Sequence, residues 1–285
     1  MCTYAVEYNS RSVLEWMVEH GFKLDSCYLN RTAKYGHLDL VRWMHEEQHV
    51  PLDNMTMSWA ALSGNISLLR YVMEKGGKLN SDTLSSAAWS GSEVMVRWLH
   101  DEHHLPWSSE MCTSAAENGH LSLLQYLRSQ GCEWDAETGD RAAMNGHLSV
   151  LRWATEHGCP ITYYVPTVFN CAVRGHLDVL QFLYQYDSKR FLIDELEKTG
   201  IIGSVAQEGH LYVVQFLYPL QKYHYGVLLQ AVQCKKSSAL EVVQWLIECA
   251  KCKLPDKDKL EHIRDRIRLD VDKYLEEKGL VYIKK

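Results

Sequence analysis

The feature that most constrains this chain is a short motif that returns at nearly constant spacing. A Gly-His-Leu triplet begins at five glycines, and degenerate copies begin at two more. The seven are Gly36, Gly64, Gly91, Gly119, Gly146, Gly175 and Gly209, separated by 28, 27, 28, 27, 29 and 34 residues. Such a period predicts an array of similar units that form a common core by stacking, because a unit this short cannot bury its own apolar face.

An aromatic residue occupies the seventh position after each of these glycines. The same rule, extended outward from Asn9 and Ser238 and through the stretch 269–279, gives ten aromatics at one repeat position. They are Trp16, Trp43, Tyr71, Trp98, Tyr126, Trp153, Phe182, Phe216, Trp245 and Tyr274. We expect these rings to form a column that packs the units together.

Each unit is predicted to consist of two helices. The second helix follows the motif glycine, with apolar residues at helical spacing between Leu121 and Leu127, and it ends at a glycine such as Gly131. The first helix contains a pair of alanines near its end, as at Ala115 and Ala116. It is expected to begin after a capping residue eleven positions before the motif, namely Asp25, Asp53, Asn80, Ser108, Asp135 and, in the last unit, Asp256.

The string from Ala115 to Leu127 resembles the Ala-Ala-x-x-Gly-His-x-x-Val-Val-x-x-Leu core of ankyrin repeats, and the resemblance extends over roughly residues 1–250. A usual ankyrin repeat has about 33 residues and a Thr-Pro-Leu-His tetrapeptide, which is absent here. The short period is similar to that of ankyrin arrays from giant viruses, oomycetes and amoebae. The resemblance implies an all-α, ankyrin-like helical-repeat solenoid of about ten helix–turn–helix units lacking long β-hairpin fingers.

Two regions depart from the regular pattern. The spacing grows to 34 residues between Gly175 and Gly209, and Pro219 follows in the next unit, so we expect irregular stacking at residues 187–235. After residue 254 the chain becomes strongly charged. We therefore predict a repeat array over residues 1–254 and a charged C-terminal capping unit over 255–285, because the last unit of a solenoid needs a polar outer face.

Composition limits the functions open to the chain. The net charge is −6, which argues against a nucleic-acid-binding protein. The sequence contains no run of 18 apolar residues, so we expect no membrane span. No basic stretch followed by an apolar one opens the chain, so we expect no signal peptide. The nine cysteines are odd in number and scattered, which favours reduced thiols in the cytoplasm, either the organism's own or that of a host cell, or in the nucleus.

Two motifs have a possible metal-binding interpretation. His45 to His49 matches the His-Glu-x-x-His pattern of zinc proteases, but the repeat places His49 beyond the helix end. A near copy, His100 to His104, occupies the same place in another repeat. We expect a solvated helix end and turn, with a metalloenzyme as the alternative. Cys249 and Cys252 form a lone Cys-x-x-Cys, interpreted as one buried and one exposed thiol; the alternative is a zinc site completed by Cys234 and His262. We expect no cofactor, metal or catalytic residue.

Two further periodic sets have structural interpretations. Histidines follow the motif glycine at His37, His120, His147, His176 and His210, and we expect them to tie the turn between the helices by hydrogen bonds. Arginines precede the ring position at Arg42, Arg70, Arg97 and Arg152. They indicate either a solvated outer face or a basic groove.

The last two residues of each first helix vary in chemistry from unit to unit, and in ankyrin-like arrays they belong to the concave binding face. The candidate partner-binding residues are Tyr8, Lys34, Tyr35, Leu62, Trp89, Glu117, Asn118, Met144, Asn145 and Arg174. We expect Leu62, Trp89, Met144 and Tyr35 to form an apolar patch, the alternative being that Trp89 folds inward over the next unit.

These residues predict a non-catalytic, monomeric scaffold that binds another protein on its concave face. The alternative is an adaptor that connects a partner to a larger assembly such as a ubiquitin ligase.

Overall fold

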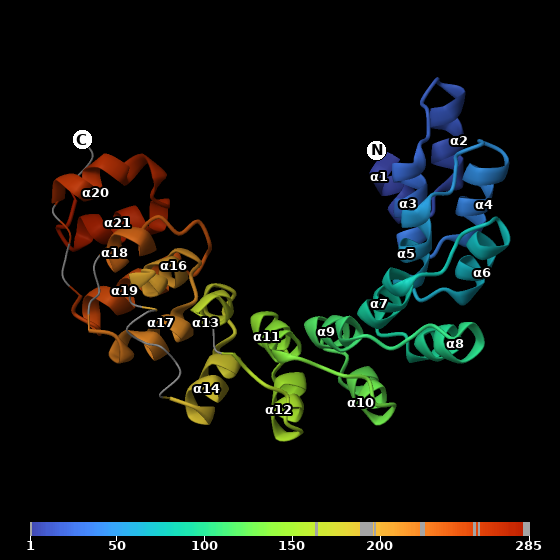
Figure 1. Ribbon diagram of the computed structural model, residues 1–285. Helices are drawn as coiled ribbons and strands as arrows, with labels where there is room; N and C mark the ends of the chain where they lie inside the picture. The colour runs from blue at the N-terminus through green and yellow to red at the C-terminus, as the bar shows by residue number, and fades with distance from the viewer. Residues whose placement is uncertain are drawn as a thin grey trace. The chain divides into compact units, whose positions relative to one another are not determined.

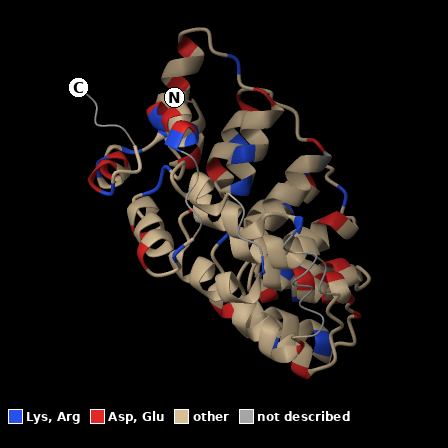
Figure 2. Cartoon of the chain, turned by 90° about the vertical axis from the view of Figure 1, so that its left-hand side faces the viewer, with Lys and Arg blue, Asp and Glu red and all other residues tan. Residues whose placement is uncertain are grey.

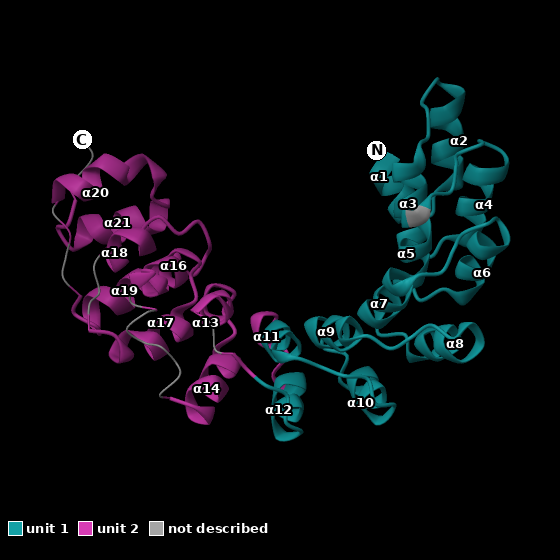
Figure 3. Ribbon diagram, viewed as in Figure 1, with its two compact units in different colours: residues 1–142, 149–160 teal, residues 143–148, 161–285 magenta. Residues whose placement is uncertain are grey.

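A computed structural model describes residues 2–162, 165–188, 196, 198–222, 226–252, 255 and 257–281. The helices described there form ten consecutive pairs, and no strand occurs among these residues. By internal contacts the chain divides into two compact units (Figure 3): unit 1 comprises residues 1–142 and 149–160, and unit 2 comprises 143–148 and 161–285. The predicted boundary after residue 254 lies beside undescribed residues and stays a prediction.

The first five pairs belong to unit 1 and have nearly uniform lengths. Their helices are α1 (Cys2–Glu7), α2 (Arg11–Glu19), α3 (Ser26–Lys34), α4 (Leu38–Glu46), α5 (Asn54–Leu62), α6 (Ile66–Glu74), α7 (Ser81–Ser90), α8 (Glu93–His103), α9 (Ser109–Glu117) and α10 (Leu121–Ser129). The sixth pair is α11 (Ala136–Met144) and α12 (Leu148–Glu156). Within unit 1 the first helices pack side by side, α3 on α5, α5 on α7 and α7 on α9, and together form what we call the inner face (Figure 1).

Local signals fix the ends of these helices as predicted. Asp25, Asp53 and Asn80 accept backbone N–H groups of the first turn of α3, α5 and α7, whereas Ser108 makes no such side-chain bond. The helix-ending glycines and the motif glycines have positive φ angles, 80° at Gly131 for example. Glycine adopts this left-handed conformation at little cost, so the chain can reverse after each helix. Asp256 lies outside the described residues.

The ring column exists, although its first member is an exception. Trp43, Tyr71, Trp98 and Tyr274 are buried, and five further rings are half-buried. Trp16 is 53% exposed, so the expectation that its ring is packed is wrong. Trp43, Tyr71 and Trp98 are each covered by an arginine of the helix pair before it. The first pair has no described pair before it.

The arginines before the ring position contact the ring of the next pair. The guanidinium of Arg42 lies 5.1 Å from the ring centre of Tyr71, that of Arg70 lies 5.2 Å from Trp98, and that of Arg97 lies 3.9 Å from Tyr126. A cation over an aromatic face is attracted by the ring quadrupole. These exposed arginines therefore link successive pairs of unit 1 on the side opposite the inner face.

The residue after the motif glycine also links successive pairs. His37 Nε2 donates to the carbonyl oxygen of Glu7 at 3.1 Å, His120 Nε2 to that of Trp89 at 3.0 Å, and Asn65 Nδ2 to that of Gly36 at 2.9 Å. The acceptors belong to the preceding pair, so the histidines join neighbouring pairs, whereas the sequence predicted a bond within the turn. In unit 2, burial lowers the pKa of His176 and of His210, which favours the neutral ring.

Unit 2 contains shorter helices in its middle. Its helices are α13 (Val165–Val173), α14 (Leu177–Tyr186), α16 (Ile201–Gln207), α17 (Leu211–Leu217), α18 (Val227–Ala231), α19 (Ala239–Glu248), α20 (Lys257–Ile263) and α21 (Leu269–Glu277). Pro219 lies in a short 3₁₀ helix, Tyr218–Leu220, that ends α17. A proline has no N–H to continue the α-helical hydrogen bonds, so the second helix is shortened there.

The last helix pair repeats a contact seen near the other end of the chain. Tyr71 Oη donates to Glu46 at 3.2 Å, and Lys75 lies 2.9 Å from the same carboxylate. Tyr274 Oη and Lys278 contact Glu248 in the same way, both at 2.9 Å. Burial and the neighbouring carboxylate raise the pKa of each tyrosine to about 12. The charged stretch 269–279 is therefore built as a true member of the repeat.

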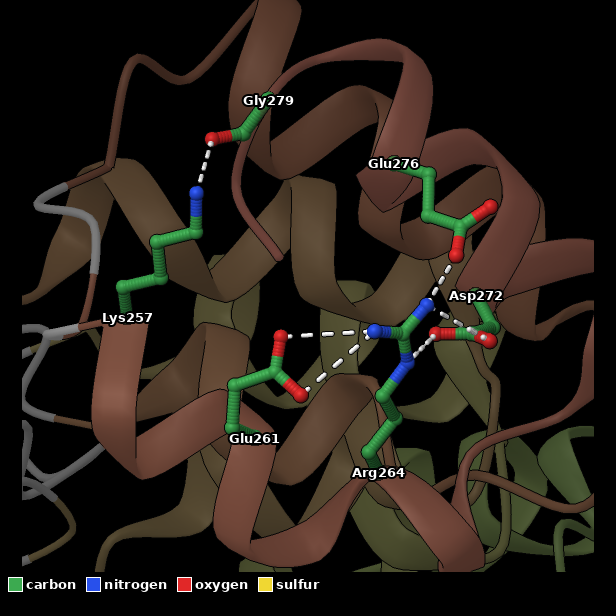
Figure 4. Close-up of polar contacts among 6 residues, drawn as sticks. All are labelled: Lys257, Glu261, Arg264, Asp272, Glu276 and Gly279. Atoms are coloured by element: carbon green, nitrogen blue, oxygen red, sulfur yellow. Dashed lines mark hydrogen bonds and ion pairs between the residues drawn. The ribbon is translucent and has the colours of Figure 1, made fainter. Parts of the chain in front are cut away.

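The last pair also contains a buried charge. The Arg264 side chain is only 5% exposed, and its Nε donates to Asp272 at 2.7 Å (Figure 4). Its two Nη atoms reach Glu261 and Glu276, so carboxylates surround the guanidinium (Figure 4). A buried cation needs such partners to offset the loss of hydration. The charged residues of the predicted cap thus form an internal network as well as a polar surface.

The distribution of charged and apolar residues along the described chain is consistent with the sequence composition. Acidic and basic residues are interspersed along the described ribbon (Figure 2). Within that part of the chain, no helix has the length and apolar content that crossing a membrane requires.

Candidate partner-binding groove

An apolar groove of about 450 Å³ lies on the inner face of unit 1. Its apolar walls are Met55, Trp59 and Leu62 of α5 and Trp89 of α7. Met55 is 54% exposed and Trp89 is 43% exposed, so large apolar side chains face solvent here. The alternative that Trp89 folds inward over the next unit is therefore wrong.

One residue of each predicted pair lines the inner face. Leu62 and Trp89 border the apolar groove together with Lys34, while Glu117 borders its continuation. These four residues occupy equivalent positions of α3, α5, α7 and α9, so the varied position in the repeat lines one continuous surface.

In three pairs of unit 1 the second residue, which is Ser63, Ser90 or Asn118, bonds to the backbone of its own helix instead. Ser63 Oγ donates to Ala60 at 2.7 Å, and Asn118 Nδ2 donates to Ser114 at 3.0 Å. The sequence did not show that the first and second residues of these pairs have different environments.

The two predicted tyrosines lie apart from the groove lining. Tyr35 Oη donates to Glu7 at 2.8 Å, and this hydrogen bond raises the pKa of Tyr35. Tyr8 is 74% exposed near the end of the first pair. The expected apolar patch therefore consists of Leu62 and Trp89 without Tyr35.

Three predicted residues belong to unit 2, where Arg174 is the centre of a polar contact. Its Nη1 donates to Asn145 Oδ1 at 2.7 Å and to the carbonyl oxygen of Met144 at 3.2 Å. Arg174 is exposed and Met144 is half-buried. These residues stay candidates for partner binding, separate from the groove of unit 1.

The sequence analysis missed Met55 and Trp59, although helical geometry contains the signal that finds them. Residues three, four and seven positions before Leu62 lie on the same face of α5, and two of these positions are Trp59 and Met55. The same offsets from Trp89 give Ser86, Ser85 and Asp82, all of which line the groove.

Lys34 supplies the cation at the apolar end of the groove. Its Nζ lies 5.2 Å from the ring centre of Trp59, and Asp82 lies on the α7 side. The ammonium group above the indole face holds that ring in place. The groove thus combines fixed aromatic surfaces with few charges, as protein-binding hot spots do.

A second hollow of about 280 Å³ lies beside the first, bordered by residues of α7, α9 and α11. It shares Ser85 and Ser114 with the apolar groove, and its lining is polar, with Glu110, Glu117 and Glu137 prominent. Together the two hollows are lined by residues of five consecutive first helices, from α3 to α11.

The zinc-protease-like string lies where the repeat predicted. Helix α4 ends at Glu46, and His49 has a φ of 55° in the turn beyond it. His45 Nδ1 is 2.9 Å from the carbonyl oxygen of Val50. In the second copy, His100 Nδ1 lies 2.8 Å from the carbonyl oxygen of Leu105. The two strings therefore share one turn-closing contact, and His45 and His49 do not lie on one face of a helix.

The Cys-x-x-Cys motif has the predicted asymmetry, since Cys249 is exposed and Cys252 is buried. Burial raises the pKa of the Cys252 thiol, which favours its protonated form. Among the residues that the structure describes, no group of three or more His, Cys, Asp or Glu side chains is placed to hold a metal ion.

Comparisons with known proteins bear on the fold. No protein-family model and no curated protein matches the sequence. Among solved structures, the chain is similar to the crystal structure of the human ASB11 ankyrin repeat domain, with a TM-score of 0.39 and 18% sequence identity, over 55% of this chain and 82% of that one. The helix pairs themselves confirm the all-α helical-repeat fold predicted from the sequence.

Proposed function

We propose that this chain is a non-catalytic scaffold that binds another protein through the groove on the inner face of unit 1. The observation that carries the proposal is the exposure of Met55 and Trp89 beside Trp59 and Leu62. Exposed apolar side chains gathered in one hollow are typical of protein-binding surfaces.

The fold supports the same conclusion. Repeat arrays bind partners along the extended surface formed by successive repeats. Here that surface displays a cation at Lys34, apolar groups at Leu62 and Trp89, and an anion at Glu117 on one regular frame. A frame with fixed geometry and varied side chains is suited to recognising one particular partner.

The remaining candidate residues extend the proposal beyond the groove. Tyr8, Tyr35 and Asn118 are proposed as further partner contacts of unit 1. Met144, Asn145 and Arg174 are proposed as partner-binding residues of unit 2. We also propose that the protein acts as a monomer in a reducing compartment. Seven of the nine cysteines are buried, as expected of thiols used as small apolar side chains.

Replacement of Trp89 tests the proposed function. We expect Trp89→Ala to cost about 2 kcal/mol of partner affinity, roughly a thirtyfold loss, because an exposed tryptophan in a groove is a typical anchor. The measurement is quantitative mass spectrometry of proteins captured from a cell lysate by wild type and variant, alongside thermal melting of each.

Trp16→Ala is the matched control, since Trp16 is a similarly exposed tryptophan on α2 and outside the groove. It should leave capture unchanged. A large loss of melting temperature in Trp89→Ala with unchanged capture would make Trp89 a structural residue and contradict the proposal.

A further inference from the structure

The apolar groove and the polar hollow adjoin on the inner face between α3 and α11, and together we call them the channel. They share Ser85 of α7 and Ser114 of α9. Met55, Trp59 and Leu62 lie on α5, and α7 contributes both Trp89 and Asp82. The other carboxylates lie on α9 and at the start of α11. A segment that occupies the whole channel therefore contacts apolar side chains at one end and carboxylates at the other.

Carboxylates outnumber cations along this channel by five to two. The acidic residues are Asp82, Glu110, Glu117, Asp135 and Glu137, and the basic ones are Lys34 and Arg141. Arg141 is shared, because it lies 3.6 Å from Glu117 and 3.0 Å from Glu137. Lys34 is at the opposite end, above Trp59. The α9 side of the channel thus has a negative excess that an incoming cation would balance.

We propose that the channel binds an extended segment of a partner protein that has an aromatic or large aliphatic residue and a Lys or Arg about three to six residues away. The apolar residue would lie between Leu62 and Trp89, and the basic residue beside Glu110 and Glu117. This inference rests on the proposed function and names the chemical class of its partner.

The spacing follows from the geometry of the frame. Packed helices lie about 8–10 Å apart, so one or two helix spacings separate the apolar end from the acidic end. An extended chain advances about 3.3 Å per residue and covers that distance in about three to six residues. A phosphate backbone is disfavoured because it would bring negative charge to the carboxylates.

The first test selects peptides from a random library of about ten residues displayed on phage, using the full chain as bait. The expected result is enrichment of sequences with an apolar anchor and a Lys or Arg about three to six residues away. Enrichment of neutral or acidic sequences overturns the proposal, and so does the absence of any enrichment over a Trp89→Ala bait. Concentration-dependent self-association that is lost in Trp89→Ala also overturns it, because a second copy would then be the occupant.

The second test measures fluorescence anisotropy of the most enriched peptide with charge variants. Glu110→Gln combined with Glu117→Gln should weaken binding about three- to tenfold at low salt, and the effect should shrink at high salt. Glu74→Gln is the matched control, because Glu74 is an exposed carboxylate at the end of α6 and outside the channel. Equal weakening by the control, or no weakening by the double variant, overturns the basic-segment proposal.

The two proposals fail in different ways. If Trp89→Ala loses the partner captured from lysate while the charge variants keep it, the protein-binding function stands and the basic class is wrong. If Trp89→Ala keeps that partner, the proposed function itself fails.

Discussion

Trp89 and Trp98 belong to the same helix pair, yet they face opposite environments. Trp98 is 8% exposed; its indole N–H donates to Glu102 at 2.7 Å and Arg70 of the preceding pair covers its ring. Trp89 is 43% exposed and lines a groove with Leu62 of the preceding pair. Tryptophan therefore has two roles within one helix pair: Trp98 packs the frame and Trp89 lines the groove. The position of each residue in the repeat decides its role.

The pattern across units explains the difference. At the position of Trp98 every unit has an aromatic residue, whereas at the position of Trp89 the chain has Lys34, Leu62 and Glu117 in neighbouring pairs. A position that is aromatic in every repeat stabilises the stack, because each interface between helix pairs has the same space for an apolar side chain. A position with varied chemistry is free to match a partner.

The largest expected effect is loss of the buried ring. Trp98→Ala should lower the free energy of unfolding by roughly 3–5 kcal/mol, because it removes apolar packing and leaves a cavity between pairs. Urea denaturation followed by circular dichroism measures this change. Trp89→Ala in parallel should cost about 1 kcal/mol or less. Similar losses in both variants would break the distinction between the two positions.

A smaller effect is expected at the turn between the two tryptophans. Gly91 has a φ of 76°, and a Cβ added there would come within 2.6 Å of the His120 ring. Gly91→Ala should therefore cost roughly 2–4 kcal/mol, from backbone strain and from overpacking. Gly131→Ala is the control, because Gly131 has a φ of 80° with no neighbouring atom within 4 Å, and it isolates the strain.

The clash at Gly91 can be relieved within the same experiment. Adding His120→Asn to Gly91→Ala should recover part of the lost stability, because Asn65 occupies the equivalent position and meets Gly36 at ordinary contact distance. Equal melting of Gly91→Ala and Gly131→Ala would show that the histidine gives way without cost. Neither Gly91 nor His120 lines the groove, but His120 donates to the carbonyl oxygen of Trp89, so partner binding well below the melting temperature should be measured in both variants.

The sequence was sufficient to predict the helix pairs, since each boundary is encoded locally. Asp53 caps α5, and Gly131 follows α10 with a positive φ angle. The ring positions follow from the nearly constant spacing of the motif glycines. Contacts between pairs were not predictable in this way. The histidines bond to carbonyl oxygens about thirty residues earlier, and that pairing depends on how the units stack.

The groove was predictable only in part. Leu62 and Trp89 were identified because they are apolar where solvent is expected, but Met55 and Trp59 were missed because only the last turn of each first helix was considered. The acidic continuation was not recognisable either. Glu110 and Glu137 are separated by a whole helix pair in the sequence, and only the packing of first helices brings them to one surface.

The smallest expected effect concerns the arginine that covers the buried ring. Arg70→Gln should lower the melting temperature by about 1–3 °C at low salt, because it removes a cation–π contact with Trp98, and the loss should be smaller at high salt. Lys78→Gln is the control, since it removes an exposed cation away from the ring column. Glutamine already occupies this position at Gln125, Gln181, Gln215 and Gln244, so the substitution itself is compatible with the frame. A loss of partner capture by Arg70→Gln without a loss of melting temperature would mean that the arginines over the ring column take part in recognition. The contrast between Trp89 and Trp98 would then no longer separate binding from stability.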